Sequence, residues 1–208
     1  MSDRVIAIDG PAGSGKSSVA RALAEALGWS FLDTGAMYRA VTVAALEKGV
    51  SPDDAGAVAV LARAAVIETL PRVVIDGRDV EDEIRTERVN EAVSVVAANP
   101  EVRAQMVERQ RAFAARQPQG TVVEGRDITT VVFPNATVKV FLTASLDERA
   151  RRRGEEGVDS VARRDEADTS RDTSPLRQAP DALVLDTTGR TVEAVVEEIR
   201  AWLRTRPH

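Results

Sequence analysis

Short apolar runs alternate along the chain with segments whose apolar residues recur at helical spacing. Five runs rich in β-branched residues predict buried strands, namely Val5–Asp9, Ser30–Asp33, Thr121–Glu124, Thr137–Leu142 and Leu183–Asp186. Between them the spacing becomes helical, as in Val19, Leu23 and Leu27, which precede the helix stop Gly28. This alternation predicts an α/β fold, a five-stranded parallel sheet with helices on both faces.

Two regions interrupt the alternation and predict insertions. Residues 66–117 contain a hairpin-like piece at 73–80 and then two helical segments, whereas residues 147–172 hold seven arginines and nine acidic residues. Ligands bind open α/β sheets at the carboxyl ends of the strands, where such insertions lie. We therefore expect a kinase-like core at 1–65 and 118–208, an acceptor-binding insertion at 66–117 and a mobile lid at 147–172 within the core.

Composition narrows the classes of function. The 208 residues are 43% hydrophobic and 29% charged, with a net charge of −5, which is typical of one globular domain. The acidic balance argues against nucleic acid polymers and anionic membranes as partners. There is no cysteine and the one histidine is His208, so thiolate or multi-histidine metal sites are excluded. No segment is suited to targeting or membrane anchoring, and we expect a cytoplasmic location.

A phosphate-binding loop follows the first expected strand. The stretch from Gly10 to Ser17 fits G-x-x-x-x-G-K-S/T at every fixed position, and an amphipathic helix follows it. Lys16 is expected to reach the β- and γ-phosphates, and the Ser17 hydroxyl to bind Mg²⁺. The expected nucleotide-binding residues are Gly10, Pro11, Ala12, Gly13, Ser14, Gly15, Lys16, Ser17 and Ser18. The loop predicts ATP or GTP as the ligand.

A GTPase also needs a base-recognition motif, and the sequence lacks one. Asp186-Thr187-Thr188-Gly189 matches D-x-x-G, but no N-K-x-D follows it. We therefore interpret Asp186 as the end of a strand.

Kinases of small phosphorylated acceptors need positive charge for a second phosphate. Arg39 follows Asp33-Thr34-Gly35, and Arg126 lies in Glu124-Gly125-Arg126-Asp127, so each comes directly after an expected strand. Both are predicted to bind the acceptor phosphate. Most arginines of residues 147–172 are instead expected to be solvated surface charges.

Several strings together resemble the bacterial cytidylate kinase family. They are Phe31-Leu32-Asp33-Thr34-Gly35-Ala36-Met37-Tyr38-Arg39, Asp82-Glu83-Ile84-Arg85-Thr86, Val123-Glu124-Gly125-Arg126-Asp127, Thr130-Val131-Val132-Phe133-Pro134, Lys139-Val140-Phe141-Leu142, Arg164-Asp165 with Asp168 and Arg171, and Ser174-Pro175-Leu176. The resemblance extends in order over nearly the whole chain. It implies the fold of P-loop nucleoside monophosphate kinases, with an acceptor-binding insertion and a lid.

The resemblance also implies which residues contact the acceptor base. Ser94, Arg103 and Asp127 would contact the cytosine edge, which offers a donor amino group beside acceptors. Two alternatives remain open at these positions. The Ser94 hydroxyl could bond its own helix backbone, and Arg103 could pair with an acidic residue.

The remaining acceptor contacts are implied in the same way. Asp168, with Arg164, would approach the ribose hydroxyls, and Arg39, Arg126 and Arg171 would hold the acceptor phosphate. Thr34 and Tyr38 would lie near that phosphate. The catalytic residues implied are Lys16, Arg126, Arg164 and Arg171.

Three positions depart from the family's pattern. Thr129 stands where a glycine is usual, so the backbone there must avoid positive φ or be strained. The hairpin at 66–80 is shortened, and the segment between Arg149 and Arg164 is shorter than in the family. The last change bears on lid closure more than on substrate identity, because the flanking arginines and aspartates are present.

These features predict a monomeric enzyme that uses ATP and Mg²⁺ to phosphorylate CMP and dCMP, with small nucleotides as its only partners. One alternative is a P-loop kinase of another small acceptor, such as UMP, AMP, shikimate or gluconate. Another is a non-catalytic ATP-binding module, which would not need Arg39, Arg126 and Arg171. A nucleic-acid-dependent ATPase is disfavoured by the acidic charge.

Overall fold

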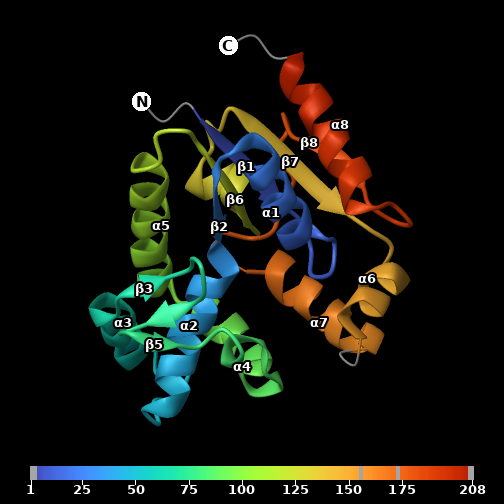
Figure 1. Cartoon of the computed structure of the whole chain (residues 1–208). Coiled ribbons are helices and arrows are strands. Elements are labelled where there is room, and N and C mark those ends of the chain that lie inside the picture. Colours follow the sequence, from blue (N-terminus) through green and yellow to red (C-terminus); the bar gives the residue numbers. More distant parts are fainter. Residues whose placement is uncertain (1–3, 155–156, 172–173, 206–208) are drawn as a thin grey trace. The chain divides into compact units, whose positions relative to one another are not determined.

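The computed structural model describes residues 4–154, 157–171 and 174–205, without the side chains of residues 157, 160 and 164. The chain divides into two compact units. The first comprises Met1–Leu32 and Phe113–His208, and the second comprises Asp33–Ala112. Each unit contains its own β-sheet (Figure 1).

The first unit contains a five-stranded parallel sheet in the order β2-β6-β1-β7-β8. Its strands are β1 (Val5–Asp9), β2 (Ser30–Asp33), β6 (Thr121–Gly125), β7 (Val138–Thr143) and β8 (Leu183–Asp186). β1 pairs in parallel with β6 on one side and with β7 on the other, and β7 pairs with β8. The expected fold class and all five strands are confirmed, and only the bounds of β6 and β7 differ, by one residue.

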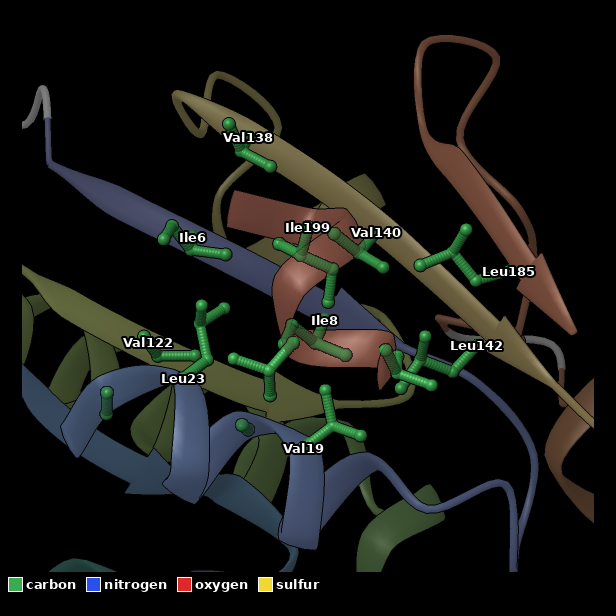
Figure 2. Packing of buried hydrophobic residues seen from close by; sticks show 14 of the residues in the cluster. Ile6, Ile8, Val19, Leu23, Val122, Val138, Val140, Leu142, Leu185 and Ile199 are labelled. Carbon is green, nitrogen blue, oxygen red and sulfur yellow. The ribbon is translucent and has the colours of Figure 1, made fainter. Parts of the chain in front are cut away.

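Two helices cover one face of this sheet. α1 (Lys16–Leu27) begins after Gly15 and ends at Gly28, both of which have left-handed backbones. α8 (Val192–Arg204) begins after Thr191, whose hydroxyl accepts a hydrogen bond from the amide of Ala194. Figure 2 shows the core between these helices and the strands. Its members include Ile6, Ile8, Val19, Leu23, Val122, Val138, Val140, Leu142, Leu185 and Ile199. Their burial holds the strand ends, and therefore the phosphate loop, in place.

Three further elements of the first unit carry polar residues. η2 (Ile128–Val132) is a single π-helical turn shortly after β6. α6 (Leu146–Arg153) and α7 (Gly157–Thr169) lie in the expected lid segment. Among the described residues, no helix is long and apolar enough to cross a bilayer.

The second unit is a group of helices with a small antiparallel sheet. The helices are α2 (Thr34–Glu47), α3 (Ala55–Ala64), η1 (Glu83–Arg85), α4 (Glu87–Ala98) and α5 (Pro100–Ala115), which extends beyond the unit at its end. The sheet contains β3 (Ile67–Glu68), β4 (Val74–Ile75) and β5 (Arg78–Asp79). Asp76 and Gly77 form the two-residue turn between β4 and β5, with φ of 51° and 81°. Such a turn matches the twist of an antiparallel hairpin.

Candidate active site

The phosphate loop connects β1 to α1, and glycine is required at two of its positions. Gly10 has φ of 155°, and a Cβ there would lie 2.1 Å from the carbonyl oxygen of Leu142. Gly13 has φ of 76°, and a Cβ there would lie 2.7 Å from the carbonyl oxygen of Arg149. The loop is therefore pressed against the end of β7 and against α6. Its amides precede the N-terminus of α1, an arrangement that favours bound anions.

Lys16 is buried inside this loop, with 5% of its surface exposed. Its Nζ donates to the carbonyl oxygen of Pro11 at 2.8 Å. Burial lowers the pKa of Lys16 to about 7, and the charge of Arg126 acts in the same direction. The carboxylates of Glu124, Asp168 and Asp9 only partly offset these effects. A negatively charged ligand beside Lys16 would favour its charged form.

Ser17 and Glu124 form the pair most suited to a divalent cation. The Ser17 Oγ donates to Glu124 Oε1 at 2.6 Å, so a hydroxyl from α1 and a carboxylate from β6 meet. Hydroxyl and carboxylate oxygens fit Mg²⁺, which is usually held by few protein ligands together with substrate phosphates. Within the described residues there is no cluster of three or more acidic or histidine side chains that could hold a metal by itself. Our sequence analysis assigned no ligand role to Glu124, although its place at the end of the strand beside β1 was a usable signal.

Arg126, Asp168 and Arg171 form a compact charge cluster. The Asp168 carboxylate accepts from Arg126 Nε at 2.5 Å and from the Arg171 guanidinium through its other oxygen. Burial by itself would raise the pKa of Asp168, but the two arginines hold it below its usual range. The structure thus brings together three of the predicted acceptor-site residues. Both guanidiniums bind the carboxylate of Asp168.

The helices α6 and α7 provide contacts that sequence analysis missed. Arg149 donates to the carbonyl oxygens of Ala12 and Ala144, each at 3.1 Å, and pairs with Asp165 of α7 at 2.6 Å. Arg149 is only 8% exposed, so the expectation of a solvated charge is wrong for it. One guanidinium therefore bonds both the phosphate loop and α7.

Arg152 is a second departure from that expectation. It donates to Thr187 Oγ1 at 2.9 Å and to the Thr187 carbonyl oxygen at 2.7 Å. Thr187 in turn donates to the Ser14 carbonyl oxygen at 3.0 Å. Arg151, in contrast, has 72% of its side chain exposed and pairs with Glu148, as expected of a surface charge. The predicted site residue Arg164 lies on α7, but its side chain is outside the described residues.

The second unit holds another group of the predicted residues. Arg39, on α2, donates through Nη1 to the Ile84 carbonyl oxygen and to Asn90 Oδ1, both at 2.7 Å. The Arg103 guanidinium, on α5, lies 5.6 Å from the centre of the Tyr38 ring. Its Nη1 donates to the carbonyl oxygen of Ala97 at 3.1 Å. The unit therefore presents two arginines whose positions are set by backbone carbonyls.

The other predicted residues have the following places. Thr34 is buried in the first turn of α2, and Ser94 is partly buried on α4. Asp127, in the first unit, directly precedes η2 and is 5% exposed. As expected, β8 ends at Asp186, whose carboxylate accepts from the amide of Thr188 at 2.8 Å.

Comparison with known sequences adds independent findings. Residues 6–205 match the family whose description is cytidylate kinase. A cytidylate kinase from Geobacillus kaustophilus is 51% identical over 211 residues, which cover 93% of this chain and 93% of that protein. A cytidylate kinase from Mycolicibacterium paratuberculosis is 48% identical over 222 residues, covering 99% of this chain and 97% of that protein.

Comparison with solved structures supports the fold. A gluconokinase from Sinorhizobium meliloti 1021 has a TM-score of 0.51 at 18% identity, covering 97% of this chain and 91% of that one. TT1252 from Thermus thermophilus has a TM-score of 0.50 at 22% identity, covering 99% of each chain. At these identities the likeness shows the fold alone, and the specific relationship comes from the sequence matches.

Proposed function

Because the chain belongs to the cytidylate kinase family, a family of nucleoside monophosphate kinases, we propose that it transfers the γ-phosphoryl group of ATP to CMP and dCMP. The observation that carries this proposal is the family match over residues 6–205. The phosphate loop and the buried charges around it supply the chemistry that such a transfer needs. Its main requirements are positioning and neutralisation of the phosphoryl oxygens.

The loop and α1 would bind the donor nucleotide. The loop amides and the helix N-terminus favour the β- and γ-phosphates, and Lys16 would place a positive charge against them. Ser17, with Glu124 behind it, would hold Mg²⁺. When bound, this ion would neutralise the charge on the phosphate oxygens of ATP.

The cluster around Asp168 would serve the acceptor. A phosphate presents anionic oxygens of the same kind as the carboxylate that Arg126 and Arg171 now grip. We propose that the two guanidiniums bind the CMP phosphate, which frees the Asp168 carboxylate to accept from a ribose hydroxyl. The attacking phosphate oxygen is already anionic and needs no general base, which agrees with a sequence whose one histidine is His208.

The remaining contacts with CMP are proposed from the family resemblance. Arg39 is proposed to add charge for the acceptor phosphate, with Thr34 and Tyr38 near it. Ser94, Arg103 and Asp127 are proposed to contact the cytosine edge. The carboxylate of Asp127 suits the exocyclic amino group, which uracil lacks.

A coupled ADP-release assay over CMP, dCMP, UMP, AMP, shikimate and gluconate tests the proposal. We expect CMP and dCMP to be preferred, and preference for any other acceptor would refute the assignment. ATP binding without turnover on any acceptor would favour the non-catalytic alternative.

The variant Asp127→Ala tests the base contact separately. Removing the carboxylate should lower kcat/KM more for CMP than for UMP, so that their ratio falls by about tenfold or more. Equal losses for the two nucleotides would contradict the role of Asp127 in base choice while leaving the kinase assignment intact.

A further inference from the structure

Asp9 is a buried carboxylate at the point where the first strand meets the phosphate loop. It is the last residue of β1, it directly precedes Gly10, and its exposed fraction is 0%. No part of the proposed phosphoryl transfer assigns it a task. A buried carboxylate is costly unless hydrogen-bonded, so its partners indicate what it does.

Three hydrogen bonds join Asp9 to the start of η2. Asp9 Oδ1 accepts from the amide of Ile128 at 2.8 Å, and Oδ2 accepts from the amide of Thr129 at 2.7 Å. Oδ2 also accepts from the Thr129 hydroxyl at 2.6 Å. The first amides of a helical turn have no partner within the turn, and here a carboxylate from another strand satisfies them.

The backbone of Asp9 also pairs with the end of β6, which lies before this turn in the sequence. In the pairing of β1 with β6, the backbone of Asp9 lies opposite Gly125. Gly125 precedes Arg126 and Asp127, and Ile128 and Thr129 follow them. The pair Arg126-Asp127 is therefore held from both sides by Asp9, through the sheet before it and through the carboxylate after it.

Thr129 contributes more than a backbone amide. Its backbone avoids positive φ, because among the described non-glycine residues only Asp76 and Ser174 have it. Burial raises the pKa of Asp9 to about 6, and the Thr129 hydroxyl is the strongest of the groups that oppose this rise. The hydroxyl thus helps to keep the carboxylate ionised and bonded at neutral pH.

We propose that Thr129 is a positioning residue, whose hydroxyl locks the Asp9 carboxylate onto η2 and thereby holds Arg126 and Asp127 in register with the phosphate loop. Thr129 is only 1% exposed, so it offers almost no surface to either nucleotide. Its loss should therefore affect the use of the acceptor and leave donor binding largely unchanged. This inference rests on the proposed function only in that its test measures phosphorylation of CMP.

The central test is Thr129→Val, which removes the hydroxyl at nearly constant volume, beside Thr129→Ser, which keeps it. Losing one hydrogen bond to a charged group should lower kcat/KM for CMP by roughly tenfold. The KM for ATP should stay within about twofold, and the serine variant should recover most of the activity. Thr129→Ala serves as a second hydroxyl-free variant if valine disturbs the fold, which circular dichroism would reveal.

Thr121→Val provides a matched control. Thr121, on β6, is also fully buried, and its hydroxyl has no hydrogen-bond partner in the part of the chain that the structure describes. This variant should retain normal kinetics. Normal CMP kinetics in both Thr129→Val and Thr129→Ala would overturn the proposal, and so would equal losses in the serine and valine variants. Failure of the wild-type protein to phosphorylate CMP would instead refute the proposed function.

Discussion

The buried ammonium of Lys16 should couple nucleotide binding to proton uptake. Burial and the nearby Arg126 lower the pKa of Lys16 to about 7. At pH 8 about nine tenths of the molecules would then hold a neutral amine, and at pH 7 about half would. Phosphate oxygens placed against the amine favour its charged form and should return the pKa toward about 10. ATP binding at pH 8 should therefore take up about 0.9 proton.

The sign of the pH dependence follows from this uptake. The complex holds more protons than the free protein together with free ATP, so raising the pH disfavours the complex. Between pH 7.5 and 9 the affinity for ATP should fall, approaching about tenfold per pH unit. The phosphates of free ATP are already ionised in that range and contribute little to the change.

Isothermal titration calorimetry at pH 8, with ATP and without acceptor, measures the uptake directly. The apparent enthalpy should depend on the ionisation enthalpy of the buffer, with a slope equal to the number of protons taken up. Lys16→Met should bind more weakly and lose this slope. Lys48→Met, at the exposed end of α2, is the control and should keep it. A slope near zero in the wild-type protein, or an unchanged slope in Lys16→Met, would refute the reasoning.

The other predictions concern packing and the acceptor site. Gly120 has φ of 129°, and a Cβ there would lie 2.7 Å from the Trp29 ring, so Gly120→Ala should cost about 1–3 kcal/mol in urea unfolding. Gly28→Ala meets no atom within 4 Å and should cost only about 1 kcal/mol of backbone strain, so equal costs would contradict the steric argument. Arg171→Ala should lower kcat on CMP by about a hundredfold and leave ATP affinity nearly unchanged. Arg151→Ala is the matched surface control, and a normal kcat in Arg171→Ala would mean that this guanidinium does not serve the acceptor.

Sequence patterns were most informative where structure depends on neighbouring residues. The five strands appear at the predicted places, because β-branched runs bounded by turn residues are local signals. The phosphate loop appears between β1 and α1 for the same reason. The spacing of its glycines and lysine is a local motif that is typical of one loop conformation. The hairpin turn at Asp76-Gly77 also depends on neighbouring residues. Both residues have positive φ, as a tight hairpin turn requires.

The arginines show where local signals end. Arg149, Arg151 and Arg152 lie within one short, highly charged helix, and nothing in their spacing separates them. In the fold, Arg151 is a surface charge, whereas Arg149 bonds the phosphate loop and Arg152 bonds Thr187. Which face of a helix is buried depends on what packs against it, and that is a property of the tertiary structure.

The sequence by itself determined the fold class, the phosphate loop and the resemblance to one kinase family. Each of these depends on short contiguous motifs or on the order of such motifs along the chain. Only the tertiary structure decided that Ser17 meets Glu124 and that the Thr129 hydroxyl meets Asp9. These pairs join residues that are more than a hundred positions apart. Parallel pairing of β1 with β6 places the residues that follow these two strands near one another. Asp9 and Thr129 are both buried, so their hydrogen bond is also needed to offset the cost of burying a carboxylate.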